Sequence, residues 1–243
     1  MAGRAQLIEV DERAVEWALL LEVAEAVPSE RWALVGGLMV HAHAIRAGIT
    51  PPRHTSDLDV LINIGAARIS QVAGPLQAAG FEPVEPNGTG PFHRFRRGRD
   101  VVDVMVPQAA DRTYRWRMRP VLRSPGAQQA LQRLDQYTVT GRHGGATALV
   151  NVPDATGAII AKAAAYSVDR RDRERHLEDV VVLLAATPRR YLATELSRRD
   201  RQHLRPMIQQ LSVPDAIWWS VLDDRARGFA DATFRRLREL VES

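Results

Sequence analysis

The first half of the chain mixes two patterns of hydrophobic residues. Apolar positions recur at helical spacing in residues 11–27, 38–47 and 66–79, and the last two segments end at a glycine. A shorter helix is expected over residues 127–134. Short apolar or alternating runs predict strands at residues 31–35, 57–64, 92–97, 101–106 and 148–152. Gly98 lies between two of these strands, which is typical of a hairpin.

The second half is helical by pattern. Helical spacing runs from residue 155 to the end, with breaks at residues 167–172, at Pro188 and at Pro214. We therefore predict an α+β fold, in which a mixed-sheet core over residues 1–153 is followed by a helical C-terminal region over residues 154–243.

Composition narrows the class of protein. The chain has 243 residues, 45% of them hydrophobic and 26% charged, which is ordinary for a globular protein. It contains no apolar run long enough to span a membrane, and its start lacks the apolar core of a signal peptide. Cysteine is absent, which excludes disulfides, thiolate zinc sites and cysteine nucleophiles. A cytoplasmic location is the expectation.

The positive charge is almost entirely arginine. Lys162 is the only lysine among 33 basic residues, and the net charge of +4 is a mild indication of polyanion binding. A lysine that persists in so arginine-rich a chain suggests a specific role. Arg94, Arg96, Arg97 and Arg99 surround the expected hairpin turn. They could hold the phosphates of an acceptor or form a solvated surface.

Three short motifs in the first half carry candidate chemistry. Gly36 and Gly37 join a strand to a helix, where the backbone can approach a ligand closely and the helix N-terminus favours an anion. A plain turn explains the same two glycines. Asp57 and Asp59 lie two residues apart on one strand, so their carboxylates share a face. They could hold Mg²⁺ or face solvent.

Asp103 is the third candidate. It is a single acid within an apolar strand, where an unpaired carboxylate is costly to bury. A metal ion or a proton would relieve that cost. Three carboxylates on two strands beside a glycine turn are consistent with phosphoryl transfer.

The order of these motifs resembles a known superfamily. The glycine pair, then Asp57 and Asp59, then Asp103, resemble the nucleotidyltransferases that include DNA polymerase beta. From residue 32 to residue 184 the chain is similar to AbiEii-type nucleotidyltransferases, the toxins of type IV toxin–antitoxin systems. The interval between Gly37 and Asp57 is longer than is usual in the superfamily, and a longer helix would absorb it.

The resemblance implies roles for the matching residues. Gly36 and Gly37 would hold nucleotide phosphates, with Ser56 as a hydroxyl contact. Asp57 and Asp59 would coordinate Mg²⁺. Asp103 would bind a second metal ion or accept the proton of the acceptor hydroxyl.

The resemblance also pairs a helical lysine with a later aspartate, and Lys162 and Asp179 match these positions. A lysine on a helix of small residues suits a triphosphate, although it could equally extend its charge from a buried helix to water. Seventeen residues separate the two, which on one straight helix puts them about 100° apart. Two helices separated at residues 167–172 would let them converge.

The predicted activity is transfer of a nucleoside monophosphate from an NTP to an acceptor hydroxyl. The toxin resemblance implies tRNA as acceptor and an antitoxin protein as partner. Two alternatives stay open: an antibiotic-type nucleotidyltransferase that modifies a small molecule, and a nucleotide-binding module that retains the fold without turnover.

Overall fold

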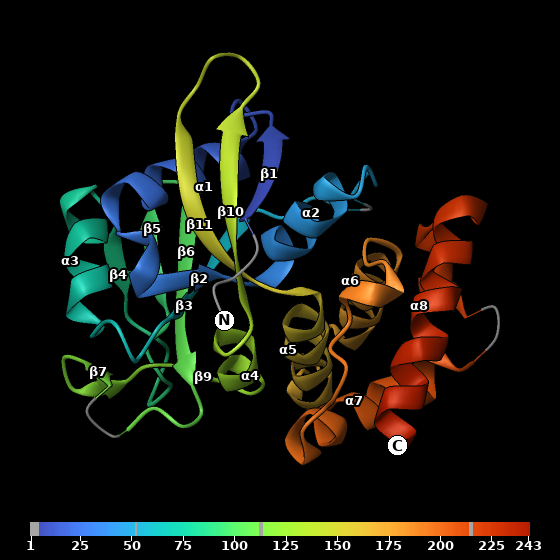
Figure 1. Ribbon diagram of the computed structural model, residues 1–243. Helices are drawn as coiled ribbons and strands as arrows, with labels where there is room; N and C mark the ends of the chain where they lie inside the picture. Colours follow the sequence, from blue (N-terminus) through green and yellow to red (C-terminus); the bar gives the residue numbers. More distant parts are fainter. Residues whose placement is uncertain (1–4, 52, 112–113, 214–215) are drawn as a thin grey trace.

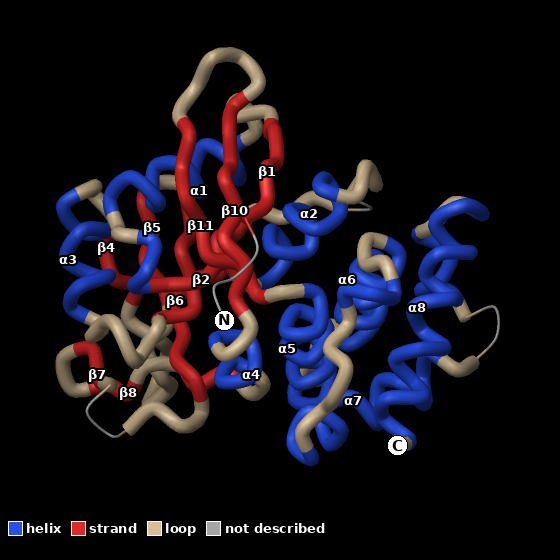
Figure 2. The backbone as a smooth tube through the Cα atoms, in the orientation of Figure 1, coloured by secondary structure: helices blue, strands red, loops and turns tan. Residues whose placement is uncertain are grey.

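The computed structural model describes residues 5–51, 53–111, 114–213 and 216–243. Two mixed β-sheets and the helices packed on them form the N-terminal part, and four helices follow the last strand (Figures 1 and 2). The fold is α+β, as the hydrophobic pattern predicts. Within the described residues, no helix combines the length and apolar character needed to cross a membrane.

The larger sheet carries the candidate residues. Its central strands β3 and β6 are parallel, whereas β2, β5 and β4 pair antiparallel with their neighbours. The strand order is β2 (Trp32–Leu34), β3 (Asp57–Ile62), β6 (Asp100–Pro107), β5 (Arg94–Arg97) and β4 (Glu82–Val84). The short β9 (Arg123–Ser124) continues beside β6, and β7 (Arg115–Trp116) and β8 (Arg119–Pro120) form a separate ribbon.

A second sheet joins the N-terminus to the middle of the chain. β1 (Ala5–Val10) pairs parallel with β10 (Leu134–Gly141), which forms a hairpin with β11 (Thr147–Pro153). This hairpin rises above the rest of the molecule in Figure 1. The hydrophobic pattern did not predict β1 or β10. β1 is a short apolar run without alternation and β10 is mostly polar, and they pair with each other across more than a hundred residues of sequence.

Helices pack on both sheets. α2 contacts β3, β1, α5 and α6, so it lies between the sheets and the C-terminal helices. The helices are α1 (Val15–Ala26), α2 (Gly36–Arg46), α3 (Ser70–Ala78), α4 (Ala127–Leu131), α5 (Ala155–Val168), α6 (Arg173–Ala185), α7 (Arg198–Leu211) and α8 (Asp224–Glu242). Short 3₁₀ helices are η1 (Ser29–Arg31), η2 (Arg189–Tyr191) and η3 (Ile217–Val221). The break predicted at residues 167–172 is confirmed, while Pro214 lies outside the described residues.

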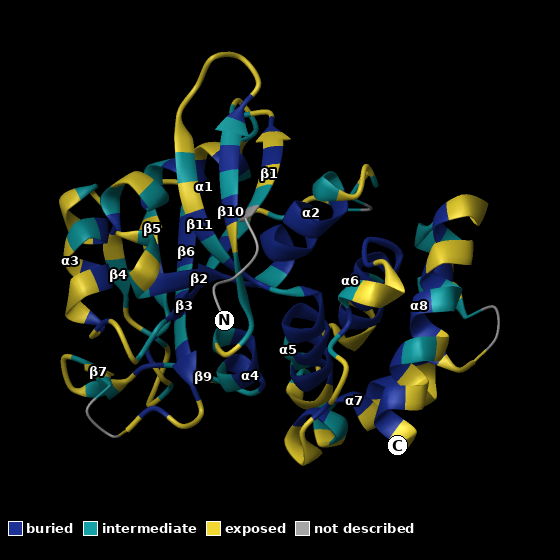
Figure 3. Cartoon of the chain, in the orientation of Figure 1, coloured by how far each residue is buried: buried dark blue, intermediate teal, exposed yellow. Residues whose placement is uncertain are grey.

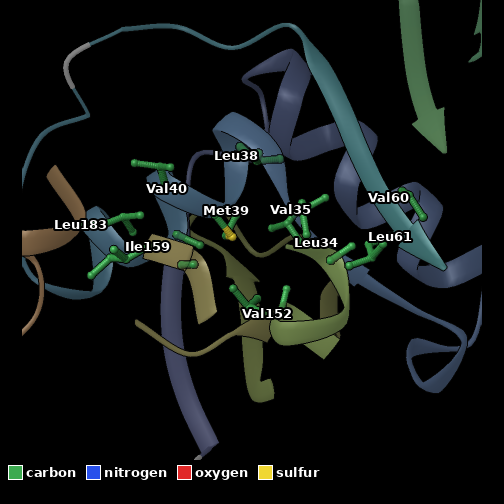
Figure 4. Close-up of a cluster of buried hydrophobic side chains, with 14 of the residues drawn as sticks. Leu34, Val35, Leu38, Met39, Val40, Val60, Leu61, Val152, Ile159 and Leu183 are labelled. Atoms are coloured by element: carbon green, nitrogen blue, oxygen red, sulfur yellow. The ribbon is translucent and has the colours of Figure 1, made fainter. Parts of the chain in front are cut away.

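One hydrophobic core holds these layers together. Leu34 and Val35, at the end of β2 and the start of α2, belong to one buried cluster with Leu61 of β3, Val152 of β11, Ile159 of α5 and Leu183 of α6 (Figure 4). Burial is continuous from the larger sheet through α2 into α5 and α6 (Figure 3). This packing fixes the start of α2 against β3, where the candidate residues lie.

Candidate functional site

The centre of the site is a row of charged residues across three adjacent strands. Asp59 on β3 stands directly opposite Asp103 on β6, and Asp103 stands opposite Arg94 on β5. Asp57 lies two residues before Asp59 and therefore faces the same side of the sheet. The apolar neighbour Leu58 points to the other side and is fully buried. Strand alternation thus gathers three carboxylates and one guanidinium on one face.

Arg94 neutralises the outer end of this row. Its Nε and Nη2 donate to the two carboxylate oxygens of Asp103, each at 2.7 Å. Its Nη2 also lies 3.7 Å from Oδ2 of Asp57. The bidentate hydrogen bonds with Asp103 raise the pKa of Arg94. Each Asp103 oxygen thus accepts one hydrogen bond from Arg94, whose positive charge opposes the binding of a metal ion there.

Asp59 has a different environment. Among the described residues, no hydrogen bond or ion pair to its carboxylate is found. Burial, together with the charges of Asp103 and Asp57, raises the pKa of Asp59 to about 6 despite the opposing charge of Lys162.

Asp57 and Asp59 fit a hard divalent cation. Both offer only oxygen donors, as Mg²⁺ prefers, and the Asp57 side chain is 42% exposed and so can be reached from solvent. The three aspartates do not form a closed cage: their oxygens do not all lie within 4.8 Å of one another. Asp11, Glu12 and His143 do come that close, but they lie elsewhere: Asp11 and Glu12 follow β1, and His143 lies in the turn between β10 and β11.

The glycine turn meets Asp59 directly. Gly36 has a φ of +70°, and an ideal Cβ placed on it would lie 2.7 Å from Cβ of Asp59 and overlap its carboxylate. An ideal Cβ on Gly37 would lie 2.7 Å from Oγ1 of Thr55. Val35, which precedes the helix, provides no side-chain cap for the first N–H groups of α2, and a helix N-terminus of this kind favours an anion.

Lys162 and Asp179 converge from two helices. Lys162 on α5 donates from Nζ to Oδ2 of Asp179 on α6 at 2.6 Å, and both side chains are buried. Arg53, in the segment between α2 and β3, donates from Nη2 to both oxygens of Asp179 at 2.8 and 3.0 Å. Although burial opposes it, the charges of Lys162 and Arg53 lower the pKa of Asp179.

Ser56 lies at the exposed entrance to β3. Its hydroxyl donates to Oδ1 of Asp57 at 2.9 Å. The structure therefore shows Ser56 as a partner of Asp57.

All eight residues singled out in the sequence lie around the meeting point of β3, β6, α2, α5 and α6. They do not all face one point, because Asp179 is buried behind Lys162 and Arg53.

The sequence analysis missed two arginines. Arg94 was considered only as a surface or acceptor-binding residue, although a two-residue hairpin turn after Arg97 places it opposite Asp103. Arg53 lies in a loop without periodicity, so no local signal indicated its contact with Asp179, 126 residues away.

A groove of about 1520 Å³ lies elsewhere. It runs between the C-terminal ends of α2 and α6, η2 and the start of α8, and Arg46, Ile49 and Phe229 line it. None of the site residues predicted from the sequence lines this groove. It is at the opposite end of α2 from Gly36, and we do not assign chemistry to it.

The chain is similar to the crystal structure of an antigenic nucleotidyltransferase-like protein from Paracoccidioides brasiliensis, with 18% identity and a TM-score of 0.49, over 81% of this chain and 89% of the other. No protein-family model matches, and no curated protein matches. The activity of this chain therefore has to be inferred from its own residues.

Proposed function

We propose that this chain is a metal-dependent nucleotidyltransferase. It would move a nucleoside monophosphate from an NTP to an acceptor hydroxyl and release pyrophosphate. The observation that carries the proposal is the position of Asp59: it lies opposite Asp103 and contacts the Gly36 turn. Carboxylates and an open helix N-terminus are the two parts that a metal-bound triphosphate requires.

Each residue has a role in this reaction. Asp57 and Asp59 would hold Mg²⁺, which when bound neutralises charge that develops on the transferred phosphoryl group. The first N–H groups of α2, at Gly36 and Gly37, would bind phosphate oxygens, and Lys162 would add a positive charge. Ser56 would contact a phosphate once its hydroxyl leaves Asp57.

The third carboxylate would act on the acceptor. Asp103 would accept the proton of the acceptor hydroxyl, whose oxygen forms a bond to the α-phosphorus while the bond from that phosphorus to the pyrophosphate oxygen breaks. Arg94, which donates to both Asp103 oxygens, would orient this carboxylate and leave a second lone pair on each oxygen for the proton. The protein thus works by positioning and by charge.

The acceptor class rests on the resemblance to AbiEii-type toxins. We propose tRNA as the acceptor and an antitoxin protein as the partner. The test is to incubate the protein with Mg²⁺, each of the four α-labelled NTPs in turn and total tRNA, beside the Asp57→Ala/Asp59→Ala variant. Label on tRNA that requires both aspartates supports the proposal and identifies the nucleotide. Bound NTP with unlabelled tRNA would overturn tRNA as the acceptor.

A second candidate is a binding module that retains the site without turnover. The contact of Arg94 with both oxygens of Asp103 favours it, because a guanidinium that donates to both oxygens stabilises the ionised carboxylate and so opposes its use as a proton acceptor. Tight NTP binding without pyrophosphate release, in the presence of Mg²⁺ and a range of acceptors, would distinguish this module from the enzyme.

A further inference from the structure

Arg53 occupies an unexpected place beside the start of α2. Its Nη2 lies 3.5 Å from an ideal Cβ on Gly37, while the same nitrogen donates to Asp179 on α6. The guanidinium therefore lies between the first turn of α2 and the C-terminal helices. No motif in the sequence indicated this placement.

Two cations share the carboxylate of Asp179. Lys162 and Arg53 both donate to it, and the exposed fractions of Asp179, Lys162 and Arg53 are 3%, 7% and 24%. Two further carboxylates lie within electrostatic range, Glu178 of Arg53 and Asp59 of Lys162. The Arg53 guanidinium also adjoins the first turn of α2, a helix end that favours an anion.

The guanidinium has unused donors. Only Nη2 binds Asp179, and Nε of Arg53 is buried without a hydrogen-bond partner in the described part of the chain. An arginine has five N–H donors in a rigid fork that matches phosphate oxygens. If Arg53 served only to neutralise Asp179, its fork would be expected to face the carboxylate with two nitrogens, as Arg94 faces Asp103.

We propose that Arg53 binds the polyphosphate of the substrate as a second cation beside Lys162, and that Asp179 is a positioning residue that holds both cations. This inference rests on the proposed function. It goes beyond it by assigning substrate binding to the α2–β3 segment and by removing Asp179 from the groups that touch the nucleotide. Recognition through Arg53 depends on the number of phosphates and not on the base.

The chain offers a closely matched control. Arg133 donates to the buried Asp200 at 3.2 Å, with exposed fractions of 26% for Arg133 and 3% for Asp200, which closely match those of Arg53 and Asp179. Each carboxylate keeps another donor when its arginine is removed, Lys162 for Asp179 and the backbone N–H of Ser197 for Asp200. Arg133→Gln and Arg53→Gln therefore remove the same charge from similar environments.

The experiment measures binding of inorganic triphosphate, ATP and AMP by calorimetry in the presence of Mg²⁺. Arg53→Gln is expected to weaken binding of triphosphate and of ATP by about ten-fold or more, and binding of AMP by less than about two-fold. Arg133→Gln is expected to change none of the three. Arg53→Lys keeps the charge but loses the fork, so its triphosphate affinity should lie between those of the wild type and Arg53→Gln.

Three outcomes would overturn the inference. If Arg53→Gln and Arg133→Gln bind triphosphate equally well, Arg53 does not touch the polyphosphate, and the proposed function stands without it. If Arg53→Gln fails to fold, Arg53→Lys carries the test, and unchanged triphosphate affinity in that variant rejects the proposal. If the wild-type protein binds neither triphosphate nor any of the four NTPs, the proposed function fails and this inference fails with it.

Discussion

The carboxylate of Asp59 occupies the space that a side chain on Gly36 would need. The two residues come from different elements, the start of α2 and the middle of β3, and the backbone N–H of Val35 also donates to the Asp59 carbonyl at 3.1 Å. The end of β2 is thus joined to β3 at the residue that faces Asp103. This contact ties the glycine turn and the acidic strand into one site.

Replacement of Gly36 by alanine should disrupt this contact. Gly36→Ala would strain a backbone with φ of +70° and also push the new methyl group into Asp59. We expect destabilisation by about 3 kcal/mol or more, since strain and overlap add, together with loss of divalent-cation binding. Urea unfolding and a calorimetric Mg²⁺ titration would measure the two effects.

Gly48 is the control for Gly36. It has the same φ of +70°, but no heavy atom of the described residues lies within 4 Å of its ideal Cβ. Gly48→Ala should therefore show only the backbone strain, about 1 kcal/mol, and unchanged cation binding. Equal destabilisation in the two variants would mean that Gly36 does not contact Asp59 in solution.

Asp179 should matter more for stability than Lys162. Asp179→Ala would remove the carboxylate to which both Lys162 and Arg53 donate, and we expect a loss of about 3–5 kcal/mol. Lys162→Met removes one buried charge and leaves Asp179 paired with Arg53, so the loss should be about 1–2 kcal/mol. Urea unfolding of both variants tests the order. A reversed order would contradict the ion pairs described here.

His43 should make stability depend on pH. It lies on α2, with Nε2 2.9 Å from the Pro153 carbonyl oxygen and Nδ1 3.2 Å from the Tyr137 hydroxyl. Burial, with a contribution from the charge of Arg46, lowers its pKa from 6.5 to about 4. Because the unfolded chain takes up this proton first, the stabilisation is complete above about pH 6.5 and is lost as the pH falls toward 4.

The lowered pKa of His43 also sets the size of its contribution to the free energy of unfolding. Between pH 7.5 and pH 5 the contribution of His43 to the free energy of unfolding should fall by about 2 kcal/mol. Urea unfolding of His43→Gln at the two pH values should lack this part of the change. His54→Gln, at an exposed position, should keep it. The same pH dependence in the wild type and in His43→Gln would show that His43 is not buried in its neutral form.

Arg94 should compete with a divalent cation. Arg94→Gln removes a charge that hydrogen-bonds to Asp103 and lies 3.7 Å from Asp57. We expect Mn²⁺ to bind about five-fold more tightly, which corresponds to about 1 kcal/mol, in an electron paramagnetic resonance titration. Arg96→Gln removes an exposed charge two residues along the same strand and should have little effect. The same affinity in both variants would contradict competition by Arg94.

The acidic strands could be predicted from sequence because their signals are local. Alternation placed Asp57 and Asp59 on one face, and the apolar run around Asp103 predicted its strand. The register that sets Asp59 opposite Asp103 could not be predicted, because β3 and β6 are parallel and about forty residues of intervening chain join them.

The other features that the sequence did not predict depend on contacts between distant segments of the chain. The pairing of β1 with β10 and the contact of Arg53 with Asp179 both join segments more than a hundred residues apart, and neither leaves a periodic pattern. Lys162 and Asp179 could be singled out by type and by resemblance. Their ion pair depends on how α5 and α6 pack, which helical spacing does not specify.

The most direct test of nucleotidyl transfer is to follow two labels in parallel. The protein is incubated with Mg²⁺, cellular RNA and small-molecule acceptors, and an NTP labelled on the α-phosphate in one reaction and on the γ-phosphate in the other. We predict that the α label moves to an acceptor, that the γ label leaves in pyrophosphate, and that Asp57→Ala/Asp59→Ala does neither. Transfer of the γ label to an acceptor, or α-label transfer that persists in the variant, would contradict the account.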